Sequence, residues 1–110
     1  MRAWSRRRLV LLAALAACSC LSPTLPLPPP SEPEVSGPTE QGLVRLQGSV
    51  RPNSWVFALN ERTELAYAQA THETGRYDLE IRAEVGDEIL LWYEIGNDKS
   101  ESLEVTIREP

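Results

Sequence analysis

The most restrictive feature of the sequence is a strict alternation of apolar and polar residues between positions 76 and 82. The apolar members are Tyr77, Leu79 and Ile81, and the polar members are Arg76, Asp78, Glu80 and Arg82. Successive side chains of a β-strand point to opposite faces, so this period of two buries one face and leaves the other in water. A half-buried strand is therefore predicted here.

Similar short runs recur from residue 43 onward, with turn-forming residues such as Pro52-Asn53 and Gly96-Asn97 between them. Further strands are predicted over 43–50, 55–59, 65–71, 88–94 and 103–107. A helix competes for 65–71, which is rich in alanine. A strand is preferred because no capping residue precedes the segment and its neighbours are strands. The spacing predicts an all-β fold, a small antiparallel β-sandwich of about six to seven strands.

The predicted sandwich, residues 43–108, has only 66 residues. Domains of this size bury only about 60% of the surface that their unfolded chains expose. The two cysteines, Cys18 and Cys20, both lie before the sandwich, so no disulfide is available within it. The fold must therefore depend on strand pairing and a compact apolar core.

The N-terminal segment has the pattern of a secretory signal. Residues 1–8 contain four arginines, and residues 9–17 are all apolar. This apolar run is too short for a transmembrane helix, which needs about 20 residues. Residues 1–17 are therefore predicted to be a signal peptide.

The junction Leu15-Ala16-Ala17-Cys18 resembles the lipobox of bacterial lipoproteins. The resemblance implies that the Cys18 thiol receives a diacylglyceryl group, with fatty acids such as palmitate, and that the chain is cut just before it. Two acyl chains give stable membrane anchoring. Ser19 follows the cysteine, which in this family favours the outer membrane. An ordinary secretory signal with incidental cysteines is the alternative reading.

Residues 18–42 are predicted to be a disordered, proline-rich linker. Seven of the nine prolines in the chain lie between residues 22 and 41. Proline fixes φ and lacks an N–H donor, so this stretch favours extended, polyproline II conformations. A semi-rigid spacer between the lipid and the sandwich is the expected result.

The order of several short motifs resembles bacterial Ig-like and carboxypeptidase regulatory-like domains. These motifs are Gly48-Ser49-Val50-Arg51-Pro52, Val56 to Asn60, Gly75-Arg76-Tyr77-Asp78-Leu79, Gly86 to Leu91 and the closing segment Ser100 to Ile107. The resemblance implies an Ig-like or prealbumin-like sandwich that serves as a spacer, adhesion or interaction module. These families supply no catalytic residues to transfer.

Charge and residue types exclude several function classes. Loss of the four N-terminal arginines changes the net charge from −5 to −9, which disfavours nucleic acid as a partner. The single histidine, His72, and the absence of cysteine from the sandwich exclude a zinc site of His and Cys ligands. The carboxylates that cluster in sequence are Glu84, Asp87 and Glu88, and Asp98, Glu101 and Glu104. They lack calcium-loop spacing, so no metal and no cofactor are predicted.

Two strands place large aromatic residues at alternate positions. If Val56 and Ala58 face the core, then Trp55 and Phe57 face outward, and the same alternation puts Trp92 outside. Such an aromatic strip would stack on sugar rings or anchor a protein partner. A slip of one residue would instead bury these side chains in the core.

These observations predict a non-enzymatic envelope lipoprotein that presents a small sandwich for interaction or structural support. Its expected partners are the membrane, through the lipid on Cys18, and an envelope protein or glycan. The first alternative is a carbohydrate- or peptidoglycan-binding module that uses Trp55, Phe57 and Trp92. A small enzyme that uses His72 is the second alternative.

Overall fold

The computed structural model describes residues 25–110; the predicted signal segment, Cys18 and Cys20 lie outside the described residues. Within residues 25–110, no helix is long and apolar enough to cross a membrane. The elements are β1 (Glu34–Ser36), β2 (Leu43–Ser49), β3 (Trp55–Asn60), β4 (Ala66–Ala70), the short 3-10 helix η1 (His72–Thr74), β5 (Arg76–Arg82), β6 (Glu88–Ile95), β7 (Asp98–Lys99) and β8 (Leu103–Thr106).

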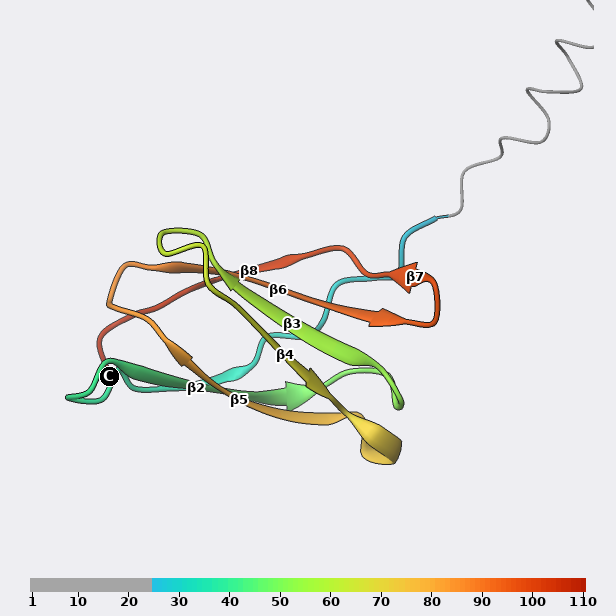
Figure 1. The fold of residues 1–110 in the computed structure, drawn as a ribbon, viewed down its shortest axis with the longest axis horizontal. Helices are drawn as coiled ribbons and strands as arrows, with labels where there is room; N and C mark the ends of the chain where they lie inside the picture. The colour runs from blue at the N-terminus through green and yellow to red at the C-terminus, as the bar shows by residue number, and fades with distance from the viewer. Residues whose placement is uncertain (1–24) are drawn as a thin grey trace, which may run out of the picture.

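The strands form two antiparallel sheets that lie in two layers (Figure 1). The smaller sheet has the order β1-β2-β5. The larger sheet has the order β4-β3-β6, and β7 and β8 both pair with β6. The predicted all-β class and small antiparallel sandwich are confirmed, and each of the six predicted strands lies within one residue of its predicted bounds.

The core lies between the two sheets and follows the alternation seen in the sequence. In β5, Tyr77, Leu79 and Ile81 are buried and the four polar residues that alternate with them are exposed. The largest fully buried apolar side chains are Leu46, Ile81, Ile89, Leu91 and Ile107. Together they come from both sheets, so burial of one face of each sheet accounts for the stability of the sandwich.

The segment 65–71, where helix and strand competed, contains the edge strand β4. Its inward-facing side chains reach the free edge of β5 in the other sheet: the Tyr67 hydroxyl accepts a hydrogen bond from the Arg82 N–H at 3.1 Å. The Gln69 side-chain oxygen accepts one from the Asp78 N–H at 2.7 Å. These contacts require a period of two along β4, which a helix would not provide.

The folded unit begins earlier than the predicted boundary at residue 43. Residues 34–36 form β1, which pairs with β2 through the register Glu34 to Gln47. Leu27 forms a parallel bridge with Ser100, and the Glu101 N–H donates to the Leu27 carbonyl at 2.9 Å. The linker prediction missed β1 because it is a three-residue edge strand, too short for an alternation and compatible with nearby prolines.

Tyr77 and Gly48 form an unusually close contact at one end of the core. They are cross-strand partners, and a Cβ atom on residue 48 would lie 2.5 Å from the Tyr77 hydroxyl oxygen. Among residues 25–110, this hydroxyl is the one buried side-chain polar atom without a hydrogen-bond partner. Burial raises the pKa of Tyr77 to about 12.

Replacement of Tyr77 by phenylalanine is expected to leave the free energy of unfolding unchanged or to raise it by about 1 kcal/mol, because a buried hydroxyl without a partner is removed. An unfolded chain ionises tyrosine near pH 10. The part of the free energy of unfolding that depends on a neutral Tyr77 phenol is therefore complete below about pH 10. It is lost as the pH rises toward 12. Urea unfolding at about pH 8 and about pH 11 tests both effects. A loss well above 1 kcal/mol at the lower pH would contradict this account.

Candidate binding face

The outer face of the larger sheet carries the aromatic residues singled out in the sequence. On β3, Val56 and Ala58 are buried in the core, which leaves Trp55 and Phe57 on the outer face. On β6, Ile89, Leu91 and Tyr93 are buried, and Trp92 lies between two of them on the outer face. The structure thus places Trp55, Phe57 and Trp92 together, and we call these three residues the aromatic ridge.

The ridge is ordered by contacts between its own members and their neighbours. Phe57 and Trp92 are cross-strand partners whose ring centroids lie 5.4 Å apart with an interplanar angle of 14°. The Trp92 Nε1–H donates to a Glu94 carboxylate oxygen at 3.2 Å, and the Lys99 Nζ lies 5.0 Å from the Trp92 ring centroid. Stacking and a cation–π contact therefore hold Trp92 in place.

Trp55 is the most open member of the ridge, with 53% of its surface exposed. On the side toward the sheet edge, the ridge is bordered by the alanines of β4. Ala70 is the cross-strand partner of Trp55, and Ala68 is the partner of Phe57. With Ala66 they form what we call the alanine ledge. Its side chains are too short to cover the neighbouring Phe57 ring. The aromatic ridge therefore stands higher above the sheet than the alanine ledge beside it.

Three glutamates form an acidic cluster on the same face, at the other end from Lys99. They are Glu61 after β3, Glu88 on β6 and Glu104 on β8, and one carboxylate oxygen of each lies within 4.8 Å of the others. Glu88 precedes Leu90 and Trp92 on the outward side of β6. Among residues 25–110, no lysine or arginine forms a salt bridge with any of the three.

Sequence reasoning missed this cluster because its members come from three separate segments. The two groups of carboxylates that are close in the sequence do not form the cluster; each contributes one member, Glu88 and Glu104. The signal lay in strand register: Glu104 is the cross-strand partner of Leu90, two residues from Glu88. Register between distant strands cannot be read from one sequence with this accuracy.

Asp87 belongs to a separate polar network that has a structural role. It is buried, and its carboxylate accepts hydrogen bonds from the Arg62 Nε at 2.6 Å, the Asn60 side-chain amide at 2.9 Å and the Glu84 N–H at 2.9 Å. The hydrogen bond from Arg62 is the main reason why the pKa of Asp87 lies well below its usual range, with Glu84 and Asn60 adding to the shift against the effect of burial. The network fixes the loop after β3 to the loop before β6.

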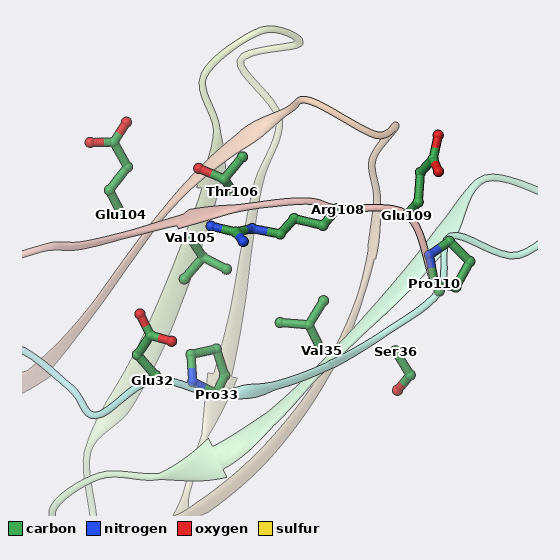
Figure 2. Close-up of a pocket in the computed structure, with 11 residues that line it drawn as sticks. Glu32, Pro33, Val35, Ser36, Glu104, Val105, Thr106, Arg108, Glu109 and Pro110 are labelled. Carbon is green, nitrogen blue, oxygen red and sulfur yellow. The ribbon is translucent and has the colours of Figure 1, made fainter.

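A groove of about 700 Å³ follows the open side of the sandwich, between β1 and β8 (Figure 2). Val35 and Val105 point into the space between the strands, and Arg108 extends along its β8 side (Figure 2). Glu104 and Glu109 point away from it (Figure 2). The polar groups do not converge on one point, so the groove is an open edge of the sandwich without a defined ligand position.

His72 lies in η1 and is exposed. Its carbonyl accepts a hydrogen bond from the Asn53 N–H. Within the part of the chain that the structure describes, no side-chain hydrogen bond joins its imidazole to a serine or a carboxylate. The geometry gives no triad around His72.

The fold and the outer face define a small antiparallel β-sandwich with an aromatic ridge. No family model, no curated protein and no solved structure matches this chain. Its function is therefore inferred from the geometry of its own residues.

Proposed function

We propose that this protein is a non-enzymatic lipoprotein of the bacterial envelope whose sandwich is an interaction module that binds through the outer face of its larger sheet. The aromatic ridge carries this proposal. Half of Trp55 lies in water beside the stacked Phe57 and Trp92, although the domain has few large apolar residues for its core. Exposure of such side chains costs free energy that a partner surface recovers when it covers them.

The anchor in this proposal is the lipid expected on Cys18. The lipobox-like junction and the apolar run before it support this attachment, and the prolines that follow provide a spacer. An outer-membrane location follows from Ser19 by the family rule. The linker side of the chain reaches the sandwich just after β7, where Leu27 forms a bridge with Ser100.

The order of the strands can be matched to that of an Ig-type sandwich, one of the two expected families. The sheet β1-β2-β5 corresponds to the A-B-E order of Ig-type sandwiches, and β3-β6-β8 corresponds to C-F-G. In this correspondence β4 is an additional strand beside strand C. Modules of this class bind partners through a sheet face or their end loops, and here the sheet face carries the aromatic side chains.

Photo-crosslinking in living cells tests the proposed face. A photoreactive amino acid at Ala68, on the alanine ledge, is expected to yield an adduct of higher mass, because this position would lie under a bound partner. The same amino acid at Glu80, exposed on the outer face of the smaller sheet, serves as the matched control. Adducts of equal yield from both positions, or none from Ala68, would contradict the proposal.

A glycan-binding module is the second candidate, and one observation favours it. The Phe57 ring stacks on Trp92, its other cross-strand partner is the small residue Ala68, and the neighbouring Trp55 is 53% exposed. Exposed aromatic side chains beside small residues are a suitable position for a sugar ring. Retention of the protein on insoluble envelope glycans, lost on replacement of Phe57 by alanine, would support this function over binding of a protein.

A further inference from the structure

We propose that the partner of the outer face is a cationic segment of an envelope protein, in which apolar side chains cover the aromatic ridge and a lysine or arginine reaches the acidic cluster. This inference rests on the proposed function and specifies the chemistry of the partner. It joins two features of one sheet face, the ridge with its ledge and the cluster of Glu61, Glu88 and Glu104.

The apolar half of the surface is already shaped for side chains of a partner. Trp55, Phe57 and Leu59 stand in a row on β3, opposite Ala70, Ala68 and Ala66 of β4. The difference in height between these rows leaves room for aliphatic or aromatic side chains to lie on the ledge against the ridge. Burial of both rows would remove apolar surface from water.

The charged half of the surface makes a neutral partner a poor match. Three carboxylates lie within 4.8 Å of one another, and no arginine or lysine pairs with them among residues 25–110. Like charges at this separation repel, and a cation placed among them would relieve the repulsion. Lys99 is at the opposite end of the face, where it covers Trp92.

The spacing of the two halves fits one short extended segment. Glu88 and Trp92 are four residues apart on β6, which corresponds to about 13 Å along a strand. A partner segment in an extended conformation covers the same distance in four residues. It would present apolar side chains at two alternate positions and cationic side chains at the next two. The acidic cluster lies at one end of the face and Lys99 at the other, so the cationic side chains of the segment are expected at the end with the cluster.

The test measures binding of two fluorescent peptides to the full-length lipidated protein in detergent micelles by anisotropy. The first peptide, Ser-Leu-Ser-Leu-Ser-Lys-Ser-Lys, carries the predicted pattern, and in the second each lysine is replaced by glutamate. An oligomer of N-acetylglucosamine is the neutral probe. The lysine peptide is expected to bind more weakly as salt increases, and the glutamate peptide is not expected to bind.

Three variants locate the binding. Glu61→Gln, Glu88→Gln and Glu104→Gln together, and Trp55→Ala with Phe57→Ala, are each expected to weaken binding of the lysine peptide about tenfold or more. Glu34→Gln, Glu73→Gln and Glu80→Gln together change the net charge equally at other exposed positions and are expected to stay within about twofold. If the aromatic variant unfolds, Ala68→Arg takes its place. It blocks the ledge with a long side chain without removing a packed one, and it is expected to weaken binding of the lysine peptide.

Other results would overturn the inference in distinguishable ways. If the control triple variant weakens the lysine peptide as much as the cluster variant, the attraction is to overall charge and the inference is wrong. If only the neutral sugar binds, with loss in the aromatic variant and no change in the cluster variant, the cationic partner is wrong while the proposed face stands. If no probe depends on the ridge or the ledge, both the inference and the proposed function fail.

Discussion

Replacement of Asp87 by alanine is expected to lower the free energy of unfolding by about 3 kcal/mol, the largest effect on stability that we expect from a polar residue in this chain. The variant removes the acceptor of the Glu84 N–H and one of the two acceptors of the buried Asn60 amide, which still donates to the Arg82 carbonyl. For a domain of this size, the midpoint of thermal unfolding should fall by about 15 °C. Chemical and thermal unfolding of the variant measure both quantities.

Asp87→Asn should lower the free energy of unfolding nearly as much as Asp87→Ala. Both carboxylate oxygens accept hydrogen bonds, from Arg62, Asn60 and Glu84, so every neighbour is a donor. An asparagine offers one oxygen and turns an NH₂ group toward the remaining donors. The variant Glu84→Ala is the matched control, because Glu84 is 76% exposed at 3.6 Å from Arg62 and should contribute under about 0.5 kcal/mol. A wild-type midpoint in Asp87→Ala would contradict the role of the network.

The same network predicts the response to acid. Since the pKa of Asp87 is lowered in the folded chain, mainly by Arg62, its contribution to stability is complete above the ordinary pKa of aspartate, near 4. It should be lost progressively as the pH falls from about 4 toward the lowered folded value. In Asp87→Ala, this part of the acid dependence should be absent. Urea midpoints measured between about pH 3 and pH 6 make the comparison.

Replacement of Cys18 by serine is expected to abolish lipid attachment and membrane retention completely. The thiol is the atom that would be alkylated, and a serine hydroxyl is a far weaker nucleophile. The wild-type chain should incorporate labelled palmitate and partition into a detergent phase. The variant should carry no label, remain uncleaved and lose the anchoring that two acyl chains provide.

Cys20→Ser is the control for that experiment, because it removes the other cysteine without touching the lipobox-like junction. It should keep the label attached at Cys18 and remain with the membrane. Loss of label in Cys20→Ser together with retention of label in Cys18→Ser would place the lipid on Cys20 instead of Cys18. Absence of label from the wild-type chain would favour an ordinary secretory signal.

Most of the sandwich could be predicted because its strands bury one face each. The alternation in 76–82 directly gives the buried face of β5, and the same rule places Trp55 and Trp92 outside once Val56 and Ile89 are inside. Even the alanine-rich segment followed the period of its neighbours rather than its helix propensity. Tertiary contacts of Tyr67 and Gln69 with β5 explain this outcome.

Two features could not be predicted, each for a physical reason. β1 is held by pairing with β2, and three exposed residues in a proline-rich segment carry no periodic signal. The acidic cluster depends on the register between β3, β6 and β8, which decides that Glu61, Glu88 and Glu104 meet. Both features arise from contacts between segments that are distant in the sequence.

The most direct test of this account is iodide quenching of Trp55 in the full-length chain with Trp4→Phe and Trp92→Phe. The outer face of the larger sheet is proposed to be open until a partner covers it, so Trp55, at 53% exposure, should emit at long wavelength and be readily quenched. Short-wavelength emission protected from iodide would place Trp55 in an apolar interior, and the aromatic ridge would then not be available as a binding surface.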